Sequence, residues 1–270
     1  MELFSAYPPE AWALLLATGT LIGLLAGLLG IGGGVVAVPV LLEVFTMAGV
    51  AEHTAVLLAI GTAQASILVA SLTAVLAHWR AGTIDNTLVR AWLPGLMVGA
   101  LLGLTLAPFA SGRTLTLVFA AVAAALAVKL IAGERLALAA RLPRQPLSHV
   151  APLAVGGLAS AVGVGAGTLS TPILTLFSFP IRNAIGAGAL FNLVISLPAT
   201  IAFLLIDRDA PGRTADALGG VALFCVASLS LPALFVAPVA ARWSTRAPVL
   251  WLQRLFALCL AIIAARLLSR

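Results

Sequence analysis

Six stretches of this sequence contain no Asp, Glu, Lys, Arg or His, and they limit the possible folds more than any other feature. They cover residues 11–42, 54–77, 91–112, 150–181, 183–206 and 217–241. A helix needs about 20 consecutive apolar residues to cross a bilayer, and every stretch is long enough. Only 9% of the chain is charged and 62% is hydrophobic, whereas soluble domains carry about 25% charged residues. One globule cannot bury so much apolar surface, so the sequence predicts a protein surrounded by lipid.

The same stretches predict helices rather than strands. In lipid, every backbone polar group must be paired within the protein, which leaves helices or a closed barrel. Barrel strands are about ten residues long and alternate in polarity, whereas these stretches are longer and uniformly apolar. We therefore expect an all-α polytopic membrane protein. The first residues, MELFSAYPPEAW, contain no Lys or Arg, so we do not expect a cleaved signal peptide.

The two halves of the sequence resemble each other. The segment GIGGGVVAVPVLL (30–42) aligns with GVGAGTLSTPILT (163–175). The matching positions are Gly30, Gly32, Gly34 and Pro39 in the first segment, and Gly163, Gly165, Gly167 and Pro172 in the second. This pattern predicts an internal duplication, with a first transmembrane repeat over 1–132, a linker over 133–149 and a second repeat over 150–270.

Each predicted repeat divides into five apolar pieces. They are 11–29, 35–48, 54–77, 88–108 and 114–132 in the first repeat, and 150–162, 168–180, 184–206, 216–237 and 248–268 in the second. If all five pieces of a repeat cross the membrane, the odd number of crossings gives the second repeat the opposite orientation to the first. An N-terminus outside then places ten basic residues inside and five outside, which agrees with the positive-inside rule and makes the linker cytoplasmic. The pieces 35–48 and 168–180 are short, so they are either full spans or half-helices that do not cross the membrane. If neither crosses, each repeat has four spans and the two repeats are parallel.

The clustered glycines predict broken helices near the membrane midplane. Glycines spaced by four, as in Gly19, Gly23 and Gly27 or in Gly95, Gly99 and Gly103, are typical of close helix packing. The clusters 30–34 and 163–167 have spacings of one or two, which no single helix face uses. Half-helix N-termini offer free N–H groups and positive dipole ends, and such breaks mark transport sites in duplicated membrane proteins. The two turns are expected to face each other and to suit an anion.

Polar residues inside apolar stretches complete the predicted site. Gln64 and Asn192 occupy similar depths in equivalent pieces; they either bond neighbouring helices or line the site beside the glycine turns. The predicted substrate-binding residues are Gly32, Gly33, Gly34, Gln64, Gly165, Gly167, Thr168 and Asn192. Backbone N–H groups near Gly32–Gly34 and Gly165–Thr168 are expected to hold the anion, with Gln64 or Asn192 donating from the side.

The sequence gives little support for a metal site, an enzyme or a nucleic-acid-binding protein. Glu43 is interpreted as an interfacial residue near the outer surface, with a proton carrier for coupling as the alternative, while His53, His78 and His149 are given no role. Cys225 and Cys259 lie in apolar pieces and are expected to form no disulfide and no metal site. No motif of a hydrolase or metalloprotease occurs, so we expect neither an enzyme nor a cofactor. The basic residues are scattered over short loops, so we expect no nucleic-acid partner.

The stretches GLLAGLLGIGGGVVAVPVLL (23–42) and GLASAVGVGAGTLSTPIL (157–174) resemble the sulfite exporter TauE/SafE family. The resemblance extends over nearly the whole chain. It implies a secondary transporter that exports sulfite, organosulfonates or related small anions across the bacterial inner membrane as a multi-pass protein. From the residues alone, a transporter of a cation or a neutral metabolite stays open, as does a homodimer.

Overall fold

A computed structural model describes residues 7–106, 147–205 and 214–268, together with positions 117, 121, 124, 127 and 128. Its helices are α2 (Pro9–Leu29), α3 (Gly34–Met47), α4 (Glu52–Arg80), α5 (Asn86–Leu106), α7 (Leu147–Val162), α8 (Gly167–Leu176), α9 (Ile181–Leu205), α10 (Leu223–Arg246) and α11 (Val249–Leu268). The expected all-α architecture is confirmed over these residues, apart from one short hairpin. Most of the predicted piece 114–132 lies outside the described residues.

Five of the described helices are long and apolar enough to cross a membrane: α2, α4, α5, α9 and α10. The chain is therefore a multi-pass membrane protein. Helices α3 and α8 have 14 and 10 residues, which at 1.5 Å per residue gives lengths of about 21 and 15 Å. The hydrocarbon core is about 30 Å thick, so neither helix can cross it alone. Of the two alternatives for the pieces 35–48 and 168–180, the structure therefore favours half-helices over full spans.

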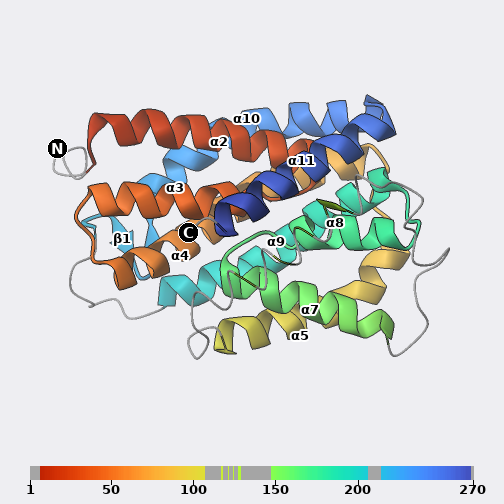
Figure 1. Ribbon diagram of the computed structural model, residues 1–270, viewed down its shortest axis with the longest axis horizontal. Coiled ribbons are helices and arrows are strands. Elements are labelled where there is room, and N and C mark those ends of the chain that lie inside the picture. Colours follow the sequence, from red (N-terminus) through yellow and green to blue (C-terminus); the bar gives the residue numbers. More distant parts are fainter. Residues whose placement is uncertain are drawn as a thin grey trace.

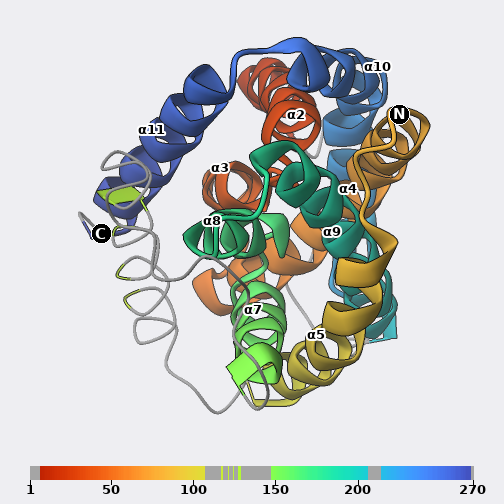
Figure 2. The same cartoon turned by 90° about the vertical axis from the view of Figure 1, so that its right-hand side faces the viewer.

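Glycines hold α2 and α10 together. Gly19, Gly23 and Gly27 face Leu229, Ala233 and Ala237, in that order, so the two helices run parallel. A Cβ atom on Gly23 would lie only 2.9 Å from Ala233 Cα. The two helices lie side by side along one edge of the molecule (Figures 1 and 2). The expected packing role of these three glycines is confirmed.

A second parallel pair, α5 and α7, lies along the opposite edge (Figure 2). Gly99 and Gly103 of α5 face Leu153 and Gly157 of α7. Ser160 of α7 donates a hydrogen bond of 2.9 Å to the carbonyl of Ala100 in α5. The predicted packing role of Gly99 and Gly103 is therefore confirmed as well.

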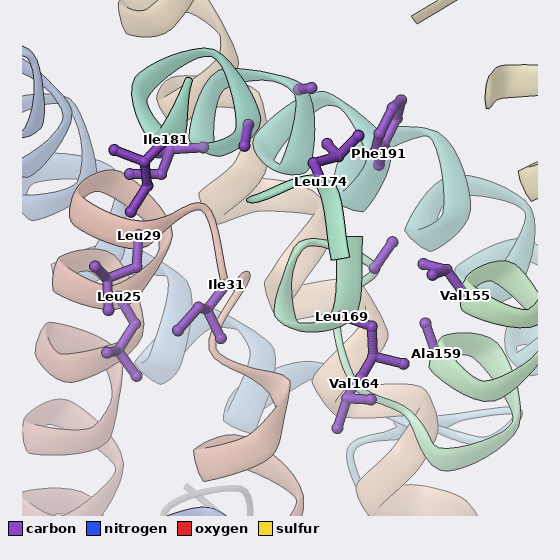
Figure 3. Packing of buried hydrophobic residues seen from close by; sticks show 14 of the residues in the cluster. Leu25, Leu29, Ile31, Val155, Ala159, Val164, Leu169, Leu174, Ile181 and Phe191 are labelled. Carbon is purple, nitrogen blue, oxygen red and sulfur yellow. The ribbon is translucent and has the colours of Figure 1, made fainter. Parts of the chain in front are cut away.

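Helices α3, α8 and α9 lie between the two pairs, together with α4 (Figure 2). One apolar cluster joins the end of α2, α5, α7, α8 and α9. It includes Ile31, which follows α2, and Val164, which follows α7 (Figure 3). Ile31 and Val164 are both buried, so each glycine cluster is anchored in this core by an apolar side chain.

The predicted apolar piece 216–237 begins with a hairpin where the sequence predicted helix. Residues 217–222 form β1 (Ala217–Leu218) and β2 (Val221–Ala222), with Gly219 at φ 60° in the turn, and α10 begins at Leu223. The Asp216 carboxylate accepts hydrogen bonds from the Phe224 N–H at 2.9 Å and from the Tyr7 hydroxyl at 2.8 Å. Burial raises the pKa of Tyr7, so the hydroxyl keeps its proton and continues to donate.

Candidate transport site at two glycine turns

The first glycine turn ends α2 and starts α3. Gly30 adopts φ 67°, and the N–H groups of Gly30 and Ile31 return to the carbonyls of Ala26 and Leu25 at 3.1 and 3.3 Å. Gly32 and Gly33 follow with φ 66° and 74°. An L-residue with a side chain loses about 1–2 kcal/mol in this left-handed region. Three left-handed residues within four positions explain why glycine occupies them, and they confirm the predicted break.

The second glycine turn separates α7 from α8 in a different way. Gly163 adopts φ 77°, and the Val164 N–H bonds to the Ala159 carbonyl at 3.0 Å. Gly165 does not have a positive φ, and glycine is needed there because neighbouring atoms leave no room for a side chain. A Cβ atom there would lie 2.5 Å from Asn192 Oδ1 and 2.9 Å from the Ile31 carbonyl oxygen.

The two turns lie against each other in opposite directions. Gly167 contacts the Gly30 carbonyl oxygen so closely that a Cβ atom would not fit, and a Cβ atom on Gly34 would lie 2.6 Å from the Gly163 carbonyl oxygen. Thr168 Oγ1 donates to the Ile31 carbonyl at 3.2 Å. The glycines thus bring two backbones within contact in the interior of the protein.

Asn192 joins both turns through its amide. Its Nδ2 donates to the Gly30 carbonyl at 2.8 Å, and its Oδ1 accepts from the Gly167 N–H at 2.7 Å. The side chain is 0% exposed and is placed near the middle of α9. The amide therefore ties the end of α2 to the start of α8, and it occupies the first N–H of α8 in this conformation.

Gln64 is placed between the two turns on α4. Ile60 lies against Gly163, and Ile67 lies against Gly32 and Gly34. Residues four and three apart share one helix face, so Gln64 lies on the face of α4 that meets both turns. Its Oε1 accepts from the Ser196 hydroxyl at 2.9 Å. Its Nε2 is buried and has no partner among the described residues.

Backbone donors at the start of α3 are also unpaired. Within residues 7–106, 147–205 and 214–268, no acceptor is found for the N–H groups of Gly32, Gly34 or Val35. The first N–H groups of α8 differ, because Gly167 bonds to Asn192 and Thr168 bonds to the Gly165 carbonyl at 3.1 Å. Unpaired N–H groups and the positive end of the helix dipole both favour a negative charge.

All eight residues predicted for the site are buried, and none carries a formal charge. The structure brings the two turns and Asn192 into direct contact and places Gln64 on the adjoining face of α4. Gly33 lies toward Ile22 of α2 instead, since a Cβ atom there would be 2.8 Å from that side chain. The described part of the chain contains no group of His, Cys, Asp and Glu residues that could hold a metal ion.

Sequence reasoning missed two contributors to this region. The carbonyls of Gly30 and Ile31 accept the bonds that join the turns, and no sequence pattern marks an acceptor. The sequence does place the hydroxyls of Thr168, Ser170 and Thr171 at the second turn only, and the hydroxyl of Ser170 is buried without a partner among the described residues.

Comparison with known proteins agrees with this architecture. The sequence profile of the family described as "Sulfite exporter TauE/SafE" matches residues 15–267. A "Probable membrane transporter protein" of Haemophilus influenzae is 29% identical over 253 residues, covering 93% of this chain and 96% of that protein. A protein of the same name from Xylella fastidiosa is 31% identical over 194 residues, covering 67% and 71%. No solved structure matches. The chain is a membrane transporter rather than an enzyme, and it belongs to the sulfite exporter TauE/SafE family.

Proposed function

We propose that this protein exports small sulfur-containing anions, such as sulfite, an organosulfonate or a related oxyanion, across the bacterial inner membrane. The family assignment supports the substrate class. The residues supply an independent argument for an anion, and the observation that carries it is the buried Nε2 of Gln64, which has no partner among the described residues and lies on the face of α4 that meets the two turns.

Gln64 Nε2 and the N–H groups at the start of α3 are all hydrogen-bond donors. The first N–H groups of any helix lack partners within the helix, whereas a buried side-chain donor without an acceptor costs about 1–3 kcal/mol, so Gln64 Nε2 is the group that asks for a ligand. An oxyanion presents several acceptor oxygens and would satisfy Gln64 Nε2 and the N–H groups of Gly34 and Val35 together. The positive end of the α3 dipole adds to the attraction.

In this proposal, Asn192 competes with the substrate for the Gly167 N–H. Its Oδ1 holds the Gly167 N–H, and an oxygen of the substrate would take that place when the site is filled. Neutral donors bind an anion about half as strongly as charged ones. A site without Lys or Arg therefore releases its substrate readily, which suits export.

A cation substrate fits these residues less well. Cation sites inside membranes generally need carboxylates. Among the described residues, Glu43 is exposed on α3, and the Asp216 carboxylate is occupied by Tyr7 and Phe224. Neither of these acids contacts the glycine turns, so we keep a cation or a neutral metabolite only as the alternative.

We further propose that the two halves are inverted repeats that build the site around a twofold axis. Equivalent residues are 133 positions apart, as Gly30 is from Gly163. The contact between Gly30 and Gly167 then becomes the contact between Gly163 and Gly34 when the halves are exchanged. Likewise, Gly23 with Ala233 in α2 and α10 becomes Gly156 with Ala100 in α7 and α5. Matched contacts of this kind are expected from inverted repeats.

The topology follows and can be tested by labelling. We expect residues before α2 to be periplasmic and the linker 133–149 to be cytoplasmic. Single cysteines at Ser5 and Ser148 in a cysteine-free background should react with a membrane-impermeant maleimide from opposite sides. Reaction of both from the same side would rule out inverted repeats.

The substrate class can be tested on purified protein by thermal unfolding. A ligand that binds the folded state raises the unfolding temperature. Sulfite, methanesulfonate and thiosulfate are the test anions, and tetramethylammonium and mannitol represent a cation and a neutral solute. We expect stabilisation by at least one sulfur anion, absent or much weaker in Gln64→Leu. Stabilisation by tetramethylammonium or mannitol alone would contradict the proposed function.

A further inference from the structure

A row of exposed side chains runs along one side of α4 and ends in a tryptophan and an arginine. Leu72 and Leu76 are exposed, and Trp79 is 69% exposed. Arg80, the last residue of α4, is exposed as well. Residues four and seven apart lie on one face of a helix, so the two leucines and the tryptophan form one stripe, with Arg80 beside its end.

The same pattern occurs on α10, with tryptophan and arginine exchanged. Phe235 and Val239 are exposed, and Trp243 is 67% exposed. Arg242, which precedes that tryptophan, is exposed too. These four residues have the same spacing as the four residues on α4, so a second apolar stripe ends in a second pair of tryptophan and arginine.

The two stripes lie on neighbouring helices and end at the same level. Helix α4 packs against α10, and Figure 2 shows the two helices side by side. Thr62 of α4 accepts from the Ala222 N–H before α10 at 3.0 Å, and further along Ala74 and Ala237 belong to one buried cluster, so the helices run parallel. On each helix the pair of tryptophan and arginine begins five residues beyond that alanine, about 7.5 Å at 1.5 Å per residue.

The end of the molecule that carries both pairs is basic. Arg90 near the start of α5, Arg246 at the end of α10 and Arg254 near the start of α11 lie at the same end and are exposed. Most of the described acids belong to the opposite ends of their helices: Glu10, Glu43, Glu52 and Asp216. Asp85 lies at the basic end, where its carboxylate accepts from the N–H groups that begin α5. This excess of positive charge attracts anions.

We propose that the ends of α4 and α10 bind the headgroup of an anionic phospholipid, whose acyl chains lie along the two apolar stripes. This inference does not depend on the transported substrate. The guanidinium groups of Arg80 and Arg242 can each bind a phosphate through paired hydrogen bonds. Tryptophan rings favour the headgroup level of a bilayer, and both pairs contain one.

The apolar stripes favour a lipid over free phosphate. Leu72 lies eight residues before Arg80, and Phe235 lies eight residues before Trp243, which is about 12 Å along each helix. The hydrocarbon of one leaflet is about 15 Å thick, so each stripe follows most of the length of an acyl chain. Inorganic phosphate gains nothing from an adjoining apolar surface, whereas a phospholipid presents both parts in one molecule.

A headgroup that contacts both arginines connects α4 to the pair of α2 and α10. Helix α4 carries Gln64, and α2 ends at the first glycine turn, which begins with Gly30. The lipid therefore stabilises the arrangement of helices around the candidate transport site. Because a ligand of the folded state stabilises it, binding should raise the unfolding temperature in detergent.

Native mass spectrometry of the delipidated protein can measure the affinity for the first bound lipid. Phosphatidylglycerol is the anionic probe, and phosphatidylcholine is the zwitterionic one. A basic residue near an anionic surface strengthens binding about fivefold. The double variant Arg80→Gln/Arg242→Gln should therefore bind phosphatidylglycerol about 25-fold more weakly, with its affinity for phosphatidylcholine unchanged. Arg80→Lys/Arg242→Lys keeps both charges and should stay within about fivefold of wild type.

The matched control is Arg90→Gln/Arg254→Gln, which removes two exposed arginines from the same end of the molecule but from α5 and α11. We expect this control to change the affinity for phosphatidylglycerol by less than about threefold. Equal losses in the two glutamine variants would mean that the basic end attracts lipid without a defined site, and they would overturn the proposal. Equal affinity of the wild type for both lipids, displacement of phosphatidylglycerol by inorganic phosphate, or a dimer that excludes the lipid would overturn it as well.

Discussion

Replacing Asn192 by alanine should destabilise the protein more than any other single truncation on the inner face of α9. The amide makes two hydrogen bonds, to the Gly30 carbonyl at 2.8 Å and from the Gly167 N–H at 2.7 Å. Both backbone partners are buried, and each would be left unpaired. A stranded buried polar group costs about 1–3 kcal/mol, so the loss should be about 2–6 kcal/mol.

Thr200 provides a matched control on the same helix, two turns further on. It is also buried, but its hydroxyl has no partner among the described residues. Thr200→Ala should therefore cost about 1 kcal/mol or less, the value of one buried methyl group. The free energy of unfolding can be measured in mixed micelles of dodecyl maltoside and SDS. If the two variants lose the same stability, Asn192 does not bridge the turns and the described geometry of the site is wrong.

Three further variants test other parts of the structure. Gln64→Leu should lower the affinity for the stabilising sulfur anion about tenfold or more, because it removes a donor worth at least 1.4 kcal/mol; unchanged stabilisation in a thermal titration would remove Gln64 from the site. Gly32→Ala should cost more stability than Gly49→Ala, since both have positive φ but only Gly32 lies against Asn192, at 2.8 Å from an added Cβ atom; equal losses would mean that backbone strain alone acts. Tyr7→Phe should lower the free energy of unfolding by about 1–3 kcal/mol, because Asp216 loses a buried donor; an unchanged melting curve would show that this bond contributes nothing.

The helices of this protein are largely predictable from its sequence. Uncharged stretches and glycine clusters predicted the ends of α2, α3 and α5 to within two residues. Local chemistry determines these ends, because a membrane helix must be apolar and a left-handed turn selects glycine. The hairpin at 217–222 was not predicted, because its residues are as apolar as the helix that follows. Asp216, which precedes the hairpin, is bonded by Tyr7, and that partner lies 209 positions away in the sequence.

The contacts within the candidate site could be predicted only in part. Gln64 and Asn192 stand out as amides in apolar stretches, so their importance is visible in the sequence. Their partners are not, because Asn192 bonds to a carbonyl 162 positions away and every residue has a carbonyl. The same holds for His78, whose partner on α2 is the backbone carbonyl of Gly27. Any residue type can supply a backbone carbonyl, so long-range bonds to the backbone cannot be predicted from residue identity.

The glycine contacts between α2 and α10, and between α5 and α7, restrict how this transporter can move. In both pairs the backbones approach so closely that a single added Cβ atom would collide with the partner, and packed interfaces of this kind deform little. We therefore expect each pair to move as one rigid body. If the site opens alternately to the two sides of the membrane by rocking of one pair against the other about the glycine turns, the hydrogen bonds of Asn192 to both turns must break.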